Sequence, residues 1–487
     1  MEKNRNKEGV VYTPAHVVKR MLENAGYMGA GILNRHVIDN SCGDGAFLVE
    51  IARRYINAWT IEHNLTNNSL ESLHQGLETY IHGIEIDPEA AKKCVENLDK
   101  VVAESHAGWR KTNWDIRVCD ALECHDFDGK MDFVIGNPPY IRVHNIKGTK
   151  TYDTLKQYEF TQCGSTDIYL AFYELGFRML KDGMSVLSYI APSGWLKGPA
   201  GKKMREYVGE HHNLSQFVDL GEAKIFEGMS PYVAITLFNN YDNDDIEYYE
   251  VKDFDSWGYT ADSFIRYEDA FINGDLYLGT GKEMDIVECV EKYDGEKFIK
   301  VKNGYATLLD DFFIYDESRF PDMEIPVTKA STGERKFCFY PYDTLGFIYT
   351  IFIVRRRNRE AFDYMWENKS RLESRSYDSE WYGFGRKQGI TDTYRSKIAV
   401  NNVIKDIKDI KISFVPAGEG VYSGQYIIFN DESRWIQTYT DIVRALCSDE
   451  FIKYVKALKK HKSGGYYTFT TKHLEKYLNW KLGTKEN

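Results

Sequence analysis

The fold of the first half of this chain follows from one stretch, Met131-Asp132-Phe133-Val134-Ile135-Gly136-Asn137-Pro138-Pro139-Tyr140. Its first six residues form a largely apolar run, which is typical of a buried strand in a parallel sheet. The two prolines after Asn137 prevent the chain from continuing as a strand or a helix. Ligands of open α/β sheets bind at the carboxyl ends of the strands. The stretch therefore predicts a rigid loop at a functional position, carrying an amide, backbone carbonyls and an aromatic ring.

Three apolar runs upstream of this stretch also end in an acid. Asp39 follows residues 36–38, Glu85 follows residues 80–84, and Asp120 follows residues 116–119. Each acid alone is explained equally well as a solvated strand end. Three in succession beside a Gly-x-Gly turn indicate a ligand site at the carboxyl edge of a parallel sheet.

The Gly-x-Gly turn is Gly43-Asp44-Gly45, and a helix is expected to begin near Phe47. Glycines let the backbone approach a ligand closely, but the third glycine of a dinucleotide fingerprint is absent. Because acids flank the turn, it suits a cationic or zwitterionic ligand better than a pyrophosphate.

The other two strand ends suit a nucleoside. Glu85 can bridge the two hydroxyls of a ribose, and Ile86 can cover one face of an adenine. Asp120 can accept a hydrogen bond from the exocyclic amine of the same adenine. At the start of the chain, Thr13 before Pro14 predicts the N-cap of a helix.

The pattern of strands and helices predicts an α/β fold with a doubly wound, Rossmann-like sheet up to about residue 240. Residues 214–220 and 232–238 are expected to close this sheet as a hairpin-like pair, and residues 141–165 read as a polar loop. We place the first domain at residues 1–245, a connecting segment at 246–285 and a mixed α+β domain at 286–487.

Basic residues concentrate locally in the second half of the chain. Arg355-Arg356-Arg357-Asn358-Arg359 is one cluster, and residues 453–476 carry seven lysines against one acid. Aromatic residues within 464–469 interleave with these lysines. Such a surface suits a phosphate backbone and bases, although a run of lysines is equally well a solvated helix face.

The Asn-Pro-Pro-Tyr loop suits chemistry at a planar amine. The lone pair of such an amine is delocalised into the ring, which makes the nitrogen a poor nucleophile. Two acceptors aimed at its N–H bonds, the Asn137 side-chain oxygen and the Pro138 carbonyl, would stabilise the charge that develops on nitrogen. Tyr140 and Phe226 can stack on the base, which has to be flipped out of a duplex to enter the pocket.

Length and composition set broad limits. The 487 residues suggest two or three domains, and the net charge of −11 argues mildly against a general nucleic-acid coat protein. No apolar run approaches the roughly 20 residues of a membrane span, and no apolar signal core follows the first residues. The eight cysteines are scattered without a CxxC pair. We therefore expect a cytoplasmic protein with reduced thiols, no metal site and no membrane partner.

Taken together, these motifs resemble the gamma-class, Taq-type N6-adenine DNA methyltransferases, which carry a C-terminal target-recognition domain. The matching stretches stand in the family's order over about the first 240 residues: Tyr12-Thr13-Pro14, Asp39 to Phe47, Glu85-Ile86-Asp87, Asp120, Asn137 to Tyr140, Asp167-Ile168-Tyr169 and Phe226. The resemblance implies a restriction-modification enzyme that transfers a methyl group from S-adenosylmethionine to a flipped-out adenine in double-stranded DNA.

The resemblance also implies a role for each matching residue. Cofactor binding would fall to Tyr12, Thr13, Asp39, Ser41, Cys42, Gly43, Glu85, Ile86, Asp120, Ala121, Asn137 and Pro139. Catalysis would fall to Asn137, Pro138 and Tyr140, and substrate binding to Tyr140, Phe226, Arg386, Lys462 and Tyr466. Two positions depart from the family: Asn40-Ser41 replaces a common proline, and Ala121 stands where some relatives have an aromatic, so packing on the cofactor adenine would be looser.

Several alternatives stay open. The same tetrapeptide occurs in enzymes acting on cytosine N4, RNA adenine or protein glutamine, although the cytosine enzymes usually begin it with Ser or Asp. A glutamine-modifying enzyme needs no large aromatic and basic second half, and a non-catalytic DNA-binding subunit needs neither the acids nor Asn137. No Asp…Glu-x-Lys cluster is evident, so we expect no DNA cleavage and leave open a separately encoded restriction endonuclease as a partner. One flipped base needs one active site, so we expect a monomer.

Overall fold

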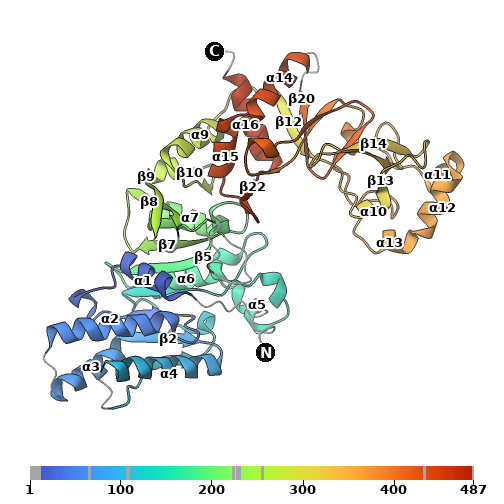
Figure 1. Ribbon diagram of the computed structural model, residues 1–487. Coiled ribbons are helices and arrows are strands. Elements are labelled where there is room, and N and C mark those ends of the chain that lie inside the picture. Colours follow the sequence, from blue (N-terminus) through green and yellow to red (C-terminus); the bar gives the residue numbers. More distant parts are fainter. Residues whose placement is uncertain are drawn as a thin grey trace. The chain divides into compact units, whose positions relative to one another are not determined.

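A computed structural model of the chain describes residues 13–63, 67–105, 110–221, 225, 232–253, 257–430 and 435–484. The chain forms two compact units, Met1–Met284 and Asp285–Asn487 (Figure 1). No helix in the described ranges is both long and apolar enough to cross a membrane.

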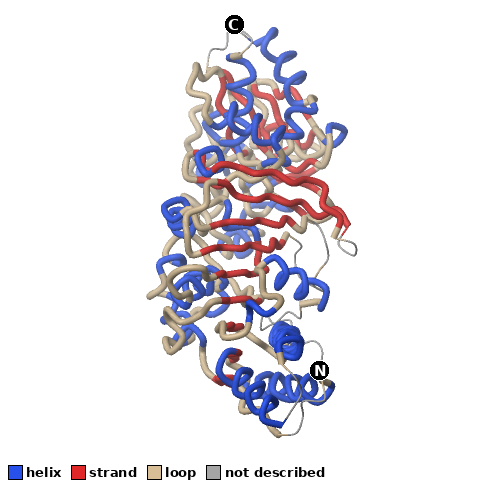
Figure 2. Tube along the Cα trace, turned by 90° about the vertical axis from the view of Figure 1, so that its left-hand side faces the viewer, coloured by secondary structure: helices blue, strands red, loops and turns tan. Residues whose placement is uncertain are grey.

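The first unit is built on a nine-stranded sheet with the order β3-β2-β1-β4-β5-β7-β6-β8-β9 (Figure 2). The first five strands in this order, β3, β2, β1, β4 and β5, are parallel to one another. Strand β7 lies between β5 and β6 and is antiparallel to both. The strands are β1 Val37–Asp39, β2 Ile81–Glu85, β3 Asp115–Val118, β4 Phe133–Gly136, β5 Val186–Pro192, β6 Leu214–Asp219, β7 Val233–Asn239, β8 Asp245–Asp253 and β9 Gly258–Arg266. The expected α/β fold with a parallel-rich sheet is confirmed.

Helices cover both faces of this sheet. Successive side chains of a strand point to opposite faces, and in β1 Val37 packs with one core cluster while Ile38 packs with the other. The first cluster contains residues of α1 Ala15–Asn24, α2 Ala46–Glu62, α3 Asn67–Tyr80 and α4 Pro88–Glu104. The second contains residues of α6 Tyr169–Met179 and α7 Lys202–His211. Burial on both faces explains why these strands are continuously apolar.

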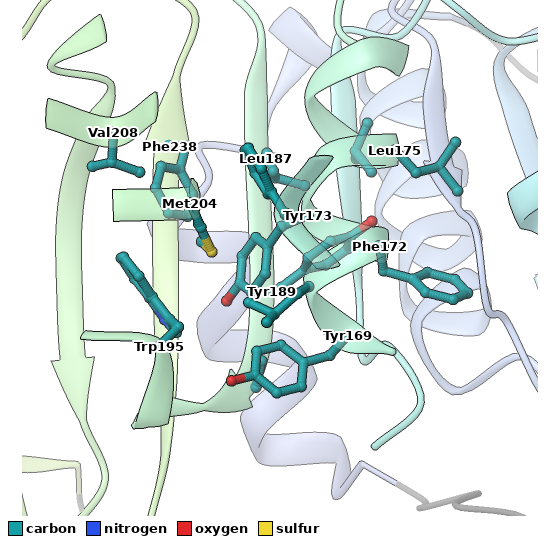
Figure 3. Packing of buried hydrophobic residues seen from close by; sticks show 14 of the residues in the cluster. Tyr169, Phe172, Tyr173, Leu175, Leu187, Tyr189, Trp195, Met204, Val208 and Phe238 are labelled. Carbon is teal, nitrogen blue, oxygen red and sulfur yellow. The ribbon is translucent and has the colours of Figure 1, made fainter. Parts of the chain in front are cut away.

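The second cluster is rich in aromatic side chains (Figure 3). The rings of Tyr173 and Tyr189 meet edge to face with their centroids 5.3 Å apart, and Tyr173 meets Phe238 in the same way at 5.7 Å. The Tyr173 hydroxyl is hydrogen bonded to Thr236 Oγ1 at 2.8 Å, so its polar end is paired within the core.

The sheet continues beyond the boundary expected from the sequence. Residues 214–219 and 233–239 do pair antiparallel, but β7 inserts between β5 and β6 and does not close the sheet. Strand β8 then pairs parallel with β6, and β9 pairs with β8, so residues 246–285 are not a connecting segment. The reason is a period-2 pattern after the acidic turn at residues 241–245, in which Ile246 and Tyr248 pack with the second cluster and Val251 with the first.

Short elements complete the first unit. The segment after Tyr140, expected as a loop, contains η4 Val143–Ile146, α5 Lys150–Leu155 and η5 Glu159–Thr161. Thr149 caps α5 by accepting a hydrogen bond from the Tyr152 N–H. The remaining elements are η2 Ala30–Ile32, η3 Ala121–Glu123, η6 Ser193–Leu196, α8 Tyr267–Ala270, β10 Phe271–Ile272 and β11 Asp275–Leu276, and α9 Gly281–Glu291 spans the boundary between the units.

The second unit mixes helices with three small sheets, of orders β12-β20-β16-β18, β13-β15-β14-β19 and β17-β22-β21. The strands are β12 Ile299–Asn303, β13 Ile314–Tyr315, β14 Glu324–Lys329, β15 Arg335–Phe339, β16 Lys397–Val400, β17 Val403–Ile404, β18 Ile412–Val415, β19 Gly420–Tyr422, β20 Gln425–Phe429, β21 His461–Lys462 and β22 Tyr466–Thr468. The helices are α10 Asp310–Phe313, α11 Ile351–Arg357, α12 Arg359–Glu367, α13 Lys369–Glu373, η7 Ile390–Asp392, η8 Ile407–Asp409, α14 Trp435–Leu446, α15 Asp449–Ala457 and α16 Thr471–Gly483.

The hydrogen bond inside the aromatic core gives a stability prediction. We expect Tyr173→Phe to lower the free energy of unfolding by about 1 kcal/mol, because it removes a buried hydrogen bond and leaves the ring in place. Urea unfolding of the full chain measures the change. The control is Tyr207→Phe in the same aromatic neighbourhood, since the Tyr207 hydroxyl has no hydrogen-bond partner in the described part of the chain. Equal losses of unfolding free energy in the two variants would contradict a stabilising role for the Tyr173 hydrogen bond.

Candidate active site

A pocket of about 310 Å³ lies at the carboxyl ends of β1, β2, β3 and β4. Parallel neighbours end at the same edge of a sheet, which is why residues far apart in the sequence meet there. The residues singled out from the sequence that line the pocket are Thr13, Asp39, Ser41, Cys42, Gly43, Glu85, Ile86, Asp120, Ala121, Asn137, Pro138 and Pro139. Tyr12 and Phe226 lie outside the described residues.

The turn after β1 is tied to the end of β2. The Gly43 N–H donates to Glu85 Oε2 at 2.8 Å, and the Asp87 N–H donates to Glu85 Oε1 at 2.9 Å. Gly45 has a φ of +93°, and a Cβ built there would lie 2.8 Å from the Cys94 sulfur. The turn therefore needs glycine at this position, and the Glu85 carboxylate fixes the turn while lining the pocket.

Asp39 is a buried acid at the floor of the site. Its side chain is 1% exposed, and its Oδ1 accepts a hydrogen bond from the Ser41 N–H at 3.1 Å. A Cβ at Gly136 would lie 2.5 Å from Oδ1, so only glycine leaves room for the carboxyl group. Burial raises the pKa of Asp39 to about 7, and the nearby Glu85 adds to the rise. The site thus holds a carboxyl group that gains from a cationic neighbour.

Asp120 closes the pocket at the end of β3. Its Oδ1 accepts a hydrogen bond from the Leu122 N–H at 3.0 Å, which caps η3. Burial raises the pKa of Asp120, while this backbone bond and the Thr151 side chain oppose the rise. Ala121 is buried beside it.

Asn137 is held at both ends of its amide group. Its Nδ2 donates to Thr13 Oγ1 at 3.1 Å, and the Tyr140 hydroxyl donates to Asn137 Oδ1 at 2.5 Å. The same hydroxyl lies 2.6 Å from the Ile190 carbonyl oxygen. Burial raises the pKa of Tyr140 well above its usual value, so the hydroxyl keeps its proton. The Asn137 carbonyl accepts from Ser41 Oγ at 3.2 Å, which joins the loop to the turn after β1.

Two of these contacts differ from the expectation. Pro14, rather than Thr13, is the N-cap of α1, and Thr13 makes no capping hydrogen bond. Its hydroxyl instead receives the Asn137 amide, a contact across 124 residues that no local pattern predicts. Tyr140 is not among the residues that line the pocket, and its ring packs edge to face on Tyr169 at 6.4 Å. Its hydroxyl positions Asn137, a role that its place in the tetrapeptide did not indicate.

The segment after Tyr140 also contributes to the pocket, which the sequence analysis missed. Ile141, Ile146, Thr149 and Thr151 of this segment line it, and so does Phe172 of α6. The only available signal was Thr149 ahead of a short helical pattern, which is a recognisable cap but says nothing of a ligand. Among the described residues, no group of three or more His, Cys, Asp or Glu side chains is arranged to hold a metal ion.

The three substrate-binding residues expected in the second unit lie in two places. Lys462 and Tyr466 are cross-strand partners in the β21–β22 hairpin, and both are exposed. Arg386 is exposed, and its backbone forms an isolated antiparallel β-bridge with Ala306. No hydrogen bond or ring contact in the described ranges links Arg386 with the hairpin pair.

The raised pKa of Asp39 makes stability depend on pH. An acid with a raised pKa in the folded state contributes stability below its unfolded pKa of 3.8, and that contribution is lost as the pH rises through about 7. That loss begins at pH 3.8, so we expect Asp39→Asn to raise the free energy of unfolding of the ligand-free chain by at most about 4 kcal/mol at pH 8, and by little more than a third of that gain at pH 5. Thermal unfolding at both pH values tests this, with exposed Asp182→Asn as the control. If the substitution raised the free energy of unfolding equally at both pH values, the raised pKa of Asp39 would be refuted.

Comparison with known proteins extends this picture. Residues 46–226 match the family model described as Eco57I restriction-modification methylase. The Type II restriction enzyme and methyltransferase RM.Eco57I of Escherichia coli is 24% identical over 478 residues, covering 78% of this chain and 48% of that protein. The Type II methyltransferase M.BstVI of Geobacillus stearothermophilus is 28% identical over 245 residues, covering 48% of this chain and 43% of that protein. The chain thus spans less than half the length of these two relatives.

Two solved structures share the fold over nearly the whole chain. The Type IIL restriction-modification enzyme MmeI, solved in complex with DNA, is 14% identical, with a TM-score of 0.57 over 94% of this chain and 63% of that chain. A nuclease-deletion mutant of the Type ISP enzyme LlaGI, solved with a DNA substrate mimic, is 11% identical, with a TM-score of 0.56 over 96% and 54%. The resemblance inferred from the motifs is therefore supported in part: residues 46–226 match the Eco57I restriction-modification methylase family model, and nearly all of the chain shares the fold of these two solved enzymes.

Proposed function

We propose that this chain is a site-specific DNA methyltransferase that methylates the N6 amino group of a flipped-out adenine in double-stranded DNA, within a restriction-modification system. The observation that carries the proposal is the oriented Asn137 amide beside Pro138, at the rim of a pocket lined by the carboxylates of three strand ends. The methyltransferase names of the relatives support the reaction type.

The pocket residues fit S-adenosylmethionine as the methyl donor. Asp39 is buried with a raised pKa, so the ammonium group of the methionine part would relieve the cost of its charge. Glu85 would accept the ribose hydroxyls and Asp120 the adenine amine. Ile86 lines the pocket yet is 63% exposed, which an adenine ring resting on it would explain. When bound, this cofactor supplies an electrophilic methyl group on a sulfonium.

The residues around Asn137 are suited to orient the target amine. The Asn137 Oδ1 has two lone pairs, so it has the capacity to accept an N–H of the base as well as the Tyr140 hydroxyl. The Pro138 carbonyl would accept the second N–H. Because Thr13 and Tyr140 fix the amide, its dipole is already aimed where positive charge develops, and no reorganisation is needed during the reaction.

Any planar amine could in principle meet these two acceptors. We favour adenine over cytosine because the tetrapeptide begins with Asn, and DNA over protein because the second unit carries exposed basic and aromatic side chains, Lys462 and Tyr466 among them. We further propose that the second unit reads the target sequence, that the chain acts as a monomer, and that any cognate endonuclease is a separate chain.

Transfer of labelled methyl groups to unmodified duplex DNA tests the proposal, and mapping of the products gives the site. We expect label on adenines within one recurring short sequence. Asn137→Ala should abolish transfer and leave the Kd for S-adenosylmethionine nearly unchanged, whereas Glu85→Ala should weaken that Kd at least about tenfold, a loss of about 1.4 kcal/mol. Absence of label on DNA, with cofactor binding intact, would redirect the proposal to RNA or protein. Equal losses of cofactor binding in the two variants would reject the acceptor role of Asn137.

Tyr140 gives a finer prediction. Tyr140→Phe keeps the ring and removes only the hydroxyl that holds Asn137, so we expect kcat to fall roughly tenfold to a hundredfold, the range for loss of one orienting hydrogen bond. The KM for DNA should change little, because the Tyr140 ring keeps its packing on Tyr169 and the hydroxyl does not line the pocket. Single-turnover kinetics separates the two effects. A rise in KM with kcat unchanged would mean that the hydroxyl acts in binding and does not position Asn137.

A further inference from the structure

The second unit presents an unusual pair of exposed apolar side chains on a tight hairpin. Leu345 is 73% exposed and Phe347 is 68% exposed, on either side of Gly346. Exposed apolar residues that occur singly need no explanation, but two at one turn tip mark a surface that is covered in use. We call these two side chains the apolar tip.

The backbone that carries the apolar tip is rigid. Asp343 Oδ1 accepts hydrogen bonds from the Leu345 and Phe347 N–H groups at 2.9 and 2.8 Å, and the Asp343 N–H donates to the Phe347 carbonyl at 2.9 Å. Gly346 has a φ of +88°, and a Cβ there would lie 3.1 Å from Ile390, a core residue. The tip is therefore a fixed projection from the core, and it loses little conformational freedom on binding.

Helix α11 follows the hairpin and adds a further apolar side chain and a basic cluster. Phe352 is 80% exposed, and Arg355 and Arg356 lie three and four residues later, on the same helix face. The described part of the chain places no carboxylate in an ion pair with either arginine. From residue 341 to residue 359 there are four arginines and one acid, in a chain whose net charge is −11. Arg359 pairs with Asp363 at 3.1 Å, whereas Arg355 and Arg356 make no such pair within the described ranges.

The sole acid of this segment does not pair with Arg355 or Arg356. It is Asp343, whose carboxylate is bound to the backbone of the tip. Uncompensated arginines complement the charge of a phosphate backbone, whereas a protein partner would have to supply a matching acidic surface. The charge therefore selects duplex DNA as the occupant of this surface.

We propose that the apolar tip is a wedge that inserts between base pairs of duplex DNA, while Arg355 and Arg356 of α11 contact phosphates. This rests on the proposed function in DNA modification and adds an element that deforms the duplex. Apolar wedges of this kind unstack a base step and untwist or kink the helix, at a cost of a few kcal/mol that backbone contacts offset. A base step loosened in this way makes flipping of a nearby base less costly.

The test measures untwisting of DNA separately from affinity. Closed circular, unmodified plasmid is relaxed by a topoisomerase in the presence of the full chain without cofactor, and the change in linking number is normalised to bound protein. We expect the double variant Leu345→Ser/Phe347→Ser to lose half or more of this change. Arg355→Gln/Arg356→Gln should retain it at saturation but flatten the slope of log K against log salt by about 2, one unit for each lost phosphate contact.

Matched controls make the outcome decisive. Phe264→Ser alters a side chain of similar exposure, 70%, in the first unit and should leave both quantities unchanged. Phe352→Ser serves as a second test of the surface should the double variant unfold, and it should weaken DNA binding. Untwisting by the double variant equal to that of the unsubstituted chain would overturn the wedge while leaving DNA modification standing. Failure of the unsubstituted chain to bind the plasmid would instead overturn the proposed function itself.

Discussion

The amide of Asn137 is held at both ends, and the order of the pocket depends on that hold. Thr13, just ahead of α1, fixes the nitrogen, and the Tyr140 hydroxyl, which also lies 2.6 Å from the Ile190 carbonyl of β5, fixes the oxygen. Ser41 ties the backbone of the same residue to the turn after β1. Through its side chain and its backbone carbonyl, this one residue therefore connects the segment ahead of α1, two strands and a turn. A flexible asparagine would have to be ordered at each turnover, whereas this one is ordered by the fold.

The site lowers the stability of the first unit. Asp39 is an acid buried where only Gly136 leaves room for it, and its burial raises its pKa to about 7. A neutral residue of the same shape would remove this cost, so the acid is best explained by a ligand that pairs with it. The first unit offsets the cost with apolar cores on both faces of the sheet.

The sequence was informative where a residue's position along a strand determines its surroundings. Asp39, Glu85, Asp120 and Asn137 each follow an apolar run, and parallel strands bring such ends together, so their convergence could be predicted. The hydroxyl of Thr13 could not be placed, because its partner is 124 residues away. Strands β8 and β9 were missed because the acidic turn before them looked like the end of a domain. The second unit has strands as short as two residues, too brief for any periodic pattern to show.

The same type of local turn occurs at the pocket and at the apolar tip. Asp39, Asp120 and Asp343 each accept a hydrogen bond from the N–H two residues later, which folds the backbone into a tight turn. Asp219 does the same after β6, away from the pocket-lining residues, so the turn is structural in origin. An acid at the end of an apolar run therefore carries two signals, a turn and a ligand, and the sequence cannot separate them. What separates them is the neighbourhood: burial and a nearby carboxylate at Asp39, and exposed apolar side chains next to Asp343, with the basic side chains of α11 following in the chain. The first arrangement fits a small cationic molecule, and the second fits a polyanion with apolar faces between its stacked bases.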